Sequence, residues 1–336
     1  MIMKNLLLVP LVLLPAACAT SSAAADGTRD PAYEKAQQAK WDRYRKGRLN
    51  AQDRVRRGRL MPQEIGRVLL DCDALLRDYF ESRKAPGNTR VESFIVSVRK
   101  ALWQLVAANF PRIMMAAEDT KYGQNRAVAL VALGVTEREE QRAQVLNPLV
   151  NAVSLKDPEL VSSACLGLGE LKDNRTPPLL LADLLNDNKR DVSIRLNACW
   201  ALTQLQDVYD TAEKKQLLSI WLGILRQPAD KAKNKVDPAI LTPVVRGLGL
   251  FRNPEHAKLM ERYTTDPTPS VRRNAAVALG RMGNQESHKA LLKMIGPHES
   301  NANVRLAARK ALQALAGGLD GKYEVEKWKS FFTRKK

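Results

Sequence analysis

Apolar residues return at helical spacing through the second half of the chain. The clearest instance is residues 266–283, which read D-P-T-P-S-V-R-R-N-A-A-V-A-L-G-R-M-G. Its apolar stripe falls at positions i, i+4, i+8 and i+11, which are Val271, Ala275, Leu279 and Met282. This spacing places the four side chains on one face of an α-helix. Asp266-Pro267 is a helix-start signal and Gly283 a stop signal, so the pattern predicts one bounded amphipathic helix.

The same pattern recurs along the chain, and we name each copy by the residue that matches Arg272, its anchor. The anchors are spaced 31 to 46 residues apart and are Arg126, Val161, Arg195, Leu241, Arg272 and Arg305. The residue seven places after each anchor is leucine in every copy. Another apolar helical segment precedes these helices, for example Glu213 to Leu225, so each copy is predicted to be a helical hairpin. Self-similarity at this period predicts a solenoid, in which each unit buries its apolar face against its neighbours.

Hairpins of this length, with a second helix of the form D-P-x-V-R-x-x-A-x-x-A-L-G, resemble HEAT repeats, particularly the bacterial type first noted in phycobilisome lyases. The resemblance covers residues 111–316 as six HEAT-like repeats. It implies an all-α fold, an α-solenoid that coils as a right-handed superhelix. In HEAT arrays an aspartate and an arginine form a structural ladder between repeats. The matching residues here are Arg126, Asp191, Arg195, Asp266, Arg272 and Arg305.

Residues 1–17 are predicted to be a signal peptide. Lys4 gives a positive start, and the apolar run from Leu6 to Leu14 is too short to cross a bilayer as a helix. The small pair Ala16-Ala17 before Cys18 resembles the lipobox of bacterial lipoproteins, in which the cysteine is lipidated and becomes the mature N-terminus. Several acyl chains anchor a protein without a transmembrane helix.

The resemblance implies a periplasm-facing lipoprotein of the bacterial cell envelope, lipidated at Cys18. Ala19 follows that cysteine where some lipoproteins have aspartate, and this favours the outer membrane. The pattern departs from the lipobox at Pro15, where an aliphatic residue is usual. A second interpretation therefore stays open: secretion with cleavage after Ala25, which would remove Cys18 and leave a soluble periplasmic or secreted protein.

Three further segments flank the repeats. Residues 18–60 are predicted to be a lipidated basic tether or helix, and residues 61–110 an N-terminal helical cap. Residues 317–336 are predicted to form a C-terminal capping helix and a basic tail, because Trp328, Phe331 and Phe332 fall at i, i+3 and i+4.

The candidate chemistry points away from catalysis. We find no phosphate-binding loop, no H-E-x-x-H and no G-x-S-x-G, and we expect no metal and no cofactor. Cys165 and Cys199 share one repeat position, and equivalent atoms of stacked helices lie roughly 8 to 10 Å apart, too far for a disulfide. Both are predicted to be small core residues. The formal net charge of +18 predicts attraction to anionic partners or surfaces.

A binding surface is expected at the second-helix positions of Arg273, Val277 and Arg281, which the core does not use. The Val277 position reads Val131, Leu166, Trp200, Arg246, Val277 and Lys310, a mixed apolar and basic strip. Trp200 is either an interface anchor or half-buried packing. The candidate partner-binding residues are Trp200, Arg246, Arg273, Val277 and Arg281.

The predicted function is a non-catalytic envelope scaffold or adaptor that binds a protein partner along the solenoid groove. One alternative is a binder of anionic polymers through the basic face. The signal segment leaves envelope polyanions such as lipopolysaccharide open and disfavours nucleic acid. The other alternative, implied by the resemblance, is a lyase-like HEAT enzyme.

Overall fold

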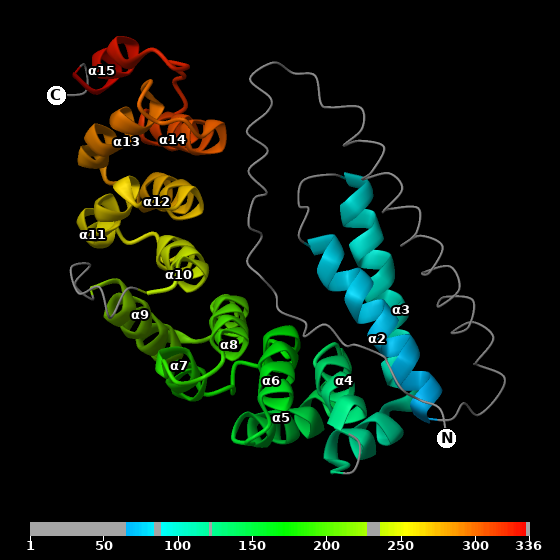
Figure 1. Ribbon diagram of the computed structural model, residues 1–336. Coiled ribbons are helices and arrows are strands. Elements are labelled where there is room, and N and C mark those ends of the chain that lie inside the picture. The colour runs from blue at the N-terminus through cyan, green and yellow to red at the C-terminus, as the bar shows by residue number, and fades with distance from the viewer. Residues whose placement is uncertain (1–64, 84–88, 121–122, 227–235, 334–336) are drawn as a thin grey trace. The chain divides into compact units, whose positions relative to one another are not determined.

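The computed structural model describes residues 65–83, 89–120, 123–226 and 236–333, and all regular structure in these ranges is helical. The chain divides into two compact units between Asp210 and Thr211. Each unit is a stack of helical hairpins (Figure 1), so the predicted all-α solenoid is confirmed. The predicted signal peptide, the lipidation residue Cys18 and the basic tether lie outside the described residues.

Unit 1 opens with two long helices, α2 and α3, which lie side by side (Figure 1). The hairpins α3 with α4, α5 with α6 and α7 with α8 follow. Asn109 interrupts α3 with a non-helical backbone two residues before Pro111. Pro111 has no backbone donor and its ring crowds the preceding turn, which favours a kink at this point. The helices of unit 1 are α2 (Ile65–Arg83), α3 (Thr89–Glu118), α4 (Gly123–Leu133), α5 (Glu139–Val153), α6 (Pro158–Leu171), α7 (Pro178–Asn186) and α8 (Val192–Leu205).

Unit 2 consists of three hairpins and a final helix (Figure 1). Helix α9 pairs with α10, α11 with α12 and α13 with α14, and α15 packs on α13. Short 3-10 turns flank α11 on both sides and lead into α13. The helices of unit 2 are α9 (Thr211–Leu225), α10 (Pro238–Leu250), α11 (Ala257–Glu261), α12 (Pro269–Met282), α13 (His288–Ile295), α14 (Ala302–Leu315) and α15 (Val325–Thr333).

The repeated apolar positions form the core of both units. The leucine seven places after each anchor has no exposed surface in any repeat: Leu133, Leu168, Leu202, Leu248, Leu279 and Leu312. The position three places after the anchor is equally buried and holds alanine or valine throughout: Ala129, Ala164, Ala198, Val244, Ala275 and Ala308. The periodicity of the sequence therefore identifies the core correctly.

Close approach between successive second helices depends on a fixed pair of small residues. Four of the six repeats have glycine eight places after the anchor, and it faces the residue six places after the next anchor, as Gly249 faces Ala278 and Gly280 faces Ala311. A Cβ built on Gly249 would lie 2.6 Å from the Cβ of Ala278. Unit 1 has the same register, where a Cβ on Gly134 would lie 2.3 Å from the carbonyl oxygen of Gly167. A side chain larger than hydrogen at Gly134 or Gly249 would therefore collide with the next second helix.

The end of unit 2 is closed by the C-terminal residues. Trp328 of α15 is fully buried and its indole Nε1 donates to the carbonyl of Lys322, 2.9 Å away. Arg309 of α14 occupies a repeat position that is apolar in the other hairpins, and it pairs with Asp320 and lies over the ring of Tyr323. The hydrogen bonds from Arg309 lower the pKa of Asp320 to about 2. A charged side chain that would otherwise face the stack is thus held by the tail.

We predict that Gly249→Ala destabilises unit 2. The added methyl group meets the backbone and side chain of Ala278, and overpacking of this kind costs about 1 to 3 kcal/mol, partly offset by the higher helix propensity of alanine. The measurement is the free energy of unfolding from urea titration.

Gly223→Ala is the matched control for this change. Gly223 is exposed within α9, and nothing lies within 4 Å of a Cβ built on it. Alanine there should stabilise the helix by roughly 0.5 to 1 kcal/mol. Equal effects of the two substitutions would contradict the packing role of Gly249.

Candidate interaction surface

The candidate surface consists of the residues one, five and nine places after each anchor, which we call the second-helix strip. In α12 these residues are Arg273, Val277 and Arg281. In unit 1 most of the strip is buried: Ala127, Val131, Val135, Leu166, Glu170 and Leu196. The remaining members in unit 1 are half-buried: Ser162, Trp200 and Gln204.

Helix α2 covers the strip of unit 1. It packs against α4, and its last turns reach α6 and α8. The hydroxyl of Tyr79 donates to Oε2 of Glu170 over 3.0 Å, and the ring of Phe80 meets Trp200 edge to face with centroids 6.0 Å apart. Burial, followed by the charge of Glu170, raises the pKa of Tyr79, which keeps the phenol protonated and donating.

Arg83, the last residue of α2, joins three groups of the strip. Its Nη1 donates to Oε1 of Glu170 at 2.5 Å, and its Nη2 donates to Oε1 of Gln204 at 3.2 Å. The guanidinium carbon lies 5.5 Å from the centroid of the Trp200 ring, in cation–π range. The Glu170 side chain is 2% exposed, so its charge depends on this arginine for compensation.

Trp200 therefore packs against its own chain. Phe80 and Arg83 cover its ring, and a Cβ built on Gly169 would lie 2.4 Å from its Cζ3 atom. Of the two interpretations of Trp200 from sequence, this geometry agrees with half-buried packing. Sequence reasoning missed Arg83 and Glu170, although an acidic residue within the apolar helix α6 was an available signal.

The strip has a different character in unit 2, where none of its members is buried. The exposed members are Arg246, Arg273, Arg281, Leu306, Lys310 and Ala314. The half-buried members are Thr242, Leu250 and Val277. Four of the five candidate partner-binding residues, Arg246, Arg273, Val277 and Arg281, thus lie on this accessible part of unit 2.

The second helices of unit 2 carry basic residues and no acidic ones. Their cationic residues are Arg246 in α10, Arg272, Arg273 and Arg281 in α12, and Arg305, Arg309 and Lys310 in α14. Arg272 pairs with Glu299, and Arg309 with Asp320. The strip residues Arg246, Arg273, Arg281 and Lys310 form no ion pair within the residues that the structure describes.

Arg281 lies at the point where these positive charges converge. Partial burial lowers its pKa, and the charges of Arg246 and Arg252 lower it further. Arg252 is held next to the end of α10 in the left-handed backbone region, with φ 53°. Like charges that gather without compensation attract anionic groups.

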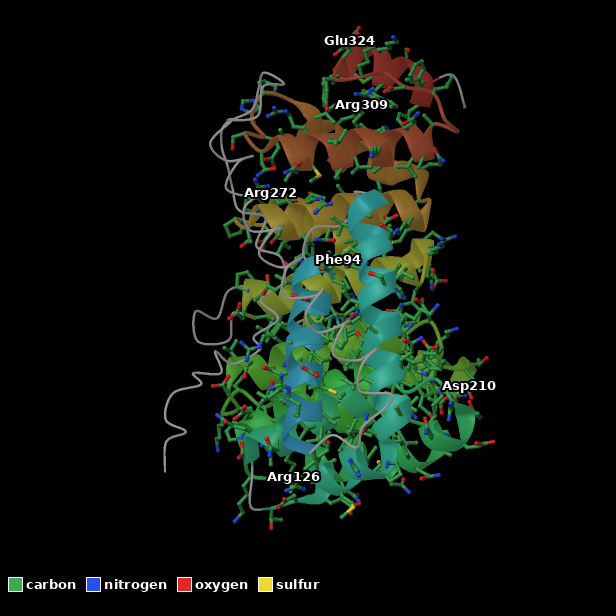
Figure 2. The ribbon with its side chains drawn as sticks, turned by 90° about the vertical axis from the view of Figure 1, so that its right-hand side faces the viewer. Phe94, Arg126, Asp210, Arg272, Arg309 and Glu324 are labelled. Atoms are coloured by element: carbon green, nitrogen blue, oxygen red, sulfur yellow. The ribbon has the colours of Figure 1, made fainter. Side chains whose placement is uncertain are left out.

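The predicted ladder residues have structural roles, but their partners differ from the expected pairing. Arginine Nε donates to a carbonyl at the end of the preceding helix: Arg126 to Ala117 at 2.8 Å and Arg195 to Leu185 at 3.0 Å. Arg305 and Arg272 instead use Nη1, which donates to the carbonyls of Glu299 and Asp266 in the connections before their helices (Figure 2 labels Arg126 and Arg272).

The two aspartates of the expected ladder are turn and cap residues instead. The Asp191 carboxylate accepts from the amide of Ser193 at the start of α8, and that of Asp266 accepts from the amide of Thr268. The acidic partner between repeats is Glu299, whose two oxygens receive Nε and Nη2 of Arg272. Asp191 is the N-cap of α8 and accepts from a free amide of its first turn, whereas Asp266 closes a turn just before α12, whose N-cap residue is Thr268.

The cysteines of the described residues lie in the core. Cys72, Cys165 and Cys199 are buried there, and burial raises the pKa of Cys165 to about 12. No group of three or more His, Cys, Asp or Glu side chains in the described ranges could hold a metal ion. None of the described helices is both long and apolar enough to cross a membrane.

Comparison with known proteins places the chain among helical-repeat folds. Residues 229–313 match the family model of HEAT repeats. A crystal structure of a Kap121p mutant is 14% identical with a TM-score of 0.52, covering 93% of this chain and 37% of that one. The crystal structure of Kap121p bound to the extreme C-terminus of the protein phosphatase Cdc14p is 14% identical with a TM-score of 0.52. This match covers 87% of this chain and 35% of Kap121p.

A designed armadillo repeat protein is 19% identical with a TM-score of 0.44. The match covers 61% of this chain and 99% of the designed protein. A comparison with curated proteins found no match. The family match and the likeness of fold support a HEAT-repeat protein.

We predict that Glu170→Gln loosens α2 from unit 1. Arg83 loses its charged partner while the shape of the side chain is kept, and because Arg83 is partly exposed we expect a loss of about 1 to 3 kcal/mol. The measurements are the free energy of unfolding and faster amide hydrogen exchange in α2. Glu139→Gln is the control, since Glu139 is exposed beside Arg142, and its effect should stay below about 0.5 kcal/mol. Unchanged exchange in α2 of the Glu170→Gln variant would contradict the role of this ion pair.

Proposed function

We propose that this chain is a non-catalytic scaffold or adaptor that binds a protein partner along the second-helix strip of unit 2. The observation that carries the proposal is the contrast between the two units. In unit 1 the strip is covered by α2, whereas in unit 2 none of the equivalent residues is buried. Four of the exposed ones are basic, and the same helices carry no acidic residue. Solenoids use extended surfaces of this kind for binding.

The composition of the strip supports a protein as the partner. Val277 and Leu306 lie among arginines, and interface cores are rich in apolar residues and arginine. Kap121p, which is similar in fold, is bound to the extreme C-terminus of Cdc14p in one of its structures. An anionic polymer is the second candidate, favoured by the unpaired positive charges of the strip. A polymer without apolar groups would leave Val277 and Leu306 uncovered.

We further propose that the protein is held in the bacterial cell envelope by lipid on Cys18 and faces the periplasm. The support is the small-residue pair before Cys18 and the short apolar run that precedes it. The basic residues between positions 29 and 59 would then lie near anionic head groups or reach towards a partner.

We expect a photo-reactive amino acid at position 277 to crosslink a reproducible protein in cells. Val277 lies in the middle of the exposed strip, so a partner bound there comes within reach of the probe. The control position is Leu179 on α7, which is 56% exposed and outside the strip. Crosslinked bands are detected by immunoblot and identified by mass spectrometry. The same bands from both positions, or none from position 277, would count against the strip.

Lipidation predicts that Cys18→Ser changes the fractionation of the protein. Wild type should sediment with membranes, and the variant should be soluble or remain unprocessed, because no acyl chains are attached. Fractionation and mass spectrometry of the mature N-terminus measure this. If the wild-type protein is soluble and its mature N-terminus follows Ala25, the proposal that Cys18 is lipidated is wrong, and the result supports secretion without a lipid.

A further inference from the structure

Unit 1 shows how the second-helix strip receives a helix. The residues nine places after the anchors of α6 and α8 are Glu170 and Gln204, and both accept hydrogen bonds from Arg83 of α2. Of the residues five places after the anchors, Leu166 is buried, and Trp200 lies against Phe80 and Arg83 of this helix. A strip of three second helices is thus wide enough for one amphipathic helix, which is fixed by an ion pair at the ninth position.

The same position in unit 2 has the opposite charge. The residue nine places after the α12 anchor is Arg281, so an exposed arginine stands where α6 has the buried Glu170. Arg246 and Arg252 lie close enough to act electrostatically on Arg281, and α10, α12 and α14 contain no carboxylate to balance them. A helix with an arginine, such as α2, would be repelled from this position.

The apolar members of the strip complete the match to a helix. Leu250, Val277 and Leu306 come from three successive second helices and lie among the arginines and Lys310. A ligand that covers them needs apolar side chains on the same face as its charges, which an amphipathic helix provides.

We propose that the ligand of unit 2 is an amphipathic helix of a partner protein whose binding face carries aspartate or glutamate, one of which pairs with Arg281. This inference rests on the proposed function and specifies the chemistry of the partner. Arginine pairs with carboxylate in a two-pronged geometry, and hydrogen bonds between charged groups are the stronger ones. In unit 1 the strip supplies the carboxylate of Glu170 and α2 supplies Arg83. In unit 2 the strip would supply Arg281 and the ligand helix the carboxylate.

The N-terminal segment of the chain itself does not have this chemistry. Residues 29–59 contain eleven Lys and Arg against four Asp and Glu. A segment with that charge would be repelled by Arg246, Arg273 and Arg281. The acidic helix therefore belongs to another protein.

The test uses the full chain and two labelled helical peptides of equal length, built of leucine and alanine with either glutamate or lysine at the same positions. Fluorescence anisotropy gives the affinities at low and physiological salt. The protein variants are Arg281→Glu and, as a control with the same change in net charge, Lys293→Glu on the exposed side of α13. Vesicles with one third anionic phospholipid and a linear polyanion are tested alongside, and thermal unfolding shows that both variants are folded.

We expect wild type and the Lys293→Glu variant to bind the glutamate peptide with similar affinity. Arg281→Glu should weaken that binding about tenfold or more and raise the affinity for the lysine peptide relative to wild type. An equal loss in both variants would mean that only net charge matters and would overturn the site. If wild type prefers the lysine peptide, the proposal of an acidic ligand is wrong. Crosslinking at position 277 would still test the separate proposal that the partner is a protein. Binding of vesicles or polyanion alone, with no peptide bound, would overturn both proposals.

Discussion

The structure depends on how closely successive second helices can approach one another. Small residues at two fixed repeat positions allow that approach, and the pairs of Gly249 with Ala278 and Gly280 with Ala311 show the register. Once the backbones are this close, the leucine and alanine positions between them are sealed from water, and burial of apolar surface provides the main stabilisation. The arginines that cap the ends of preceding helices are compatible with this stacking because they lie at the edges of the core.

The two units put the same surface positions to different use. In unit 1 the strip is part of the folded interior, and Glu170 is compensated by Arg83 from α2. In unit 2 the strip remains at the surface, and its charges face solvent. A repeat protein can therefore keep one backbone register throughout while changing the side chains that project from it, so that one stretch stabilises the chain and another is left for a ligand.

The local parts of this organisation could be predicted from the sequence, and the long-range parts could not. The Leu279 and Ala275 positions follow from helical periodicity, which is a property of neighbouring residues. The same repeat alignment selected Arg246, Arg273, Val277 and Arg281 as surface residues.

The contact of Arg83 with Glu170 joins residues 87 positions apart, and nothing in the repeat pattern indicates that α2 turns back over the second helices. For the same reason Trp200 stood out as a binding candidate, since its covering residues, Phe80 and Arg83, lie outside the repeats. The aspartates were matched to arginine by family resemblance, whereas in the structure Asp191 and Asp266 accept from backbone amides only two residues further along the chain.

The closure of α14 has a consequence for self-association. The last hairpin of a repeat stack exposes a face that fits the first hairpin of another copy of the protein. Head-to-tail contacts of this kind propagate into open filaments. In this chain Arg309 puts a charge at the position where continued stacking needs an apolar side chain, and Asp320, Tyr323 and Trp328 hold a short helix in place beside it. The tail thus places charged and aromatic groups beside α14, which disfavours head-to-tail stacking of another copy on this hairpin.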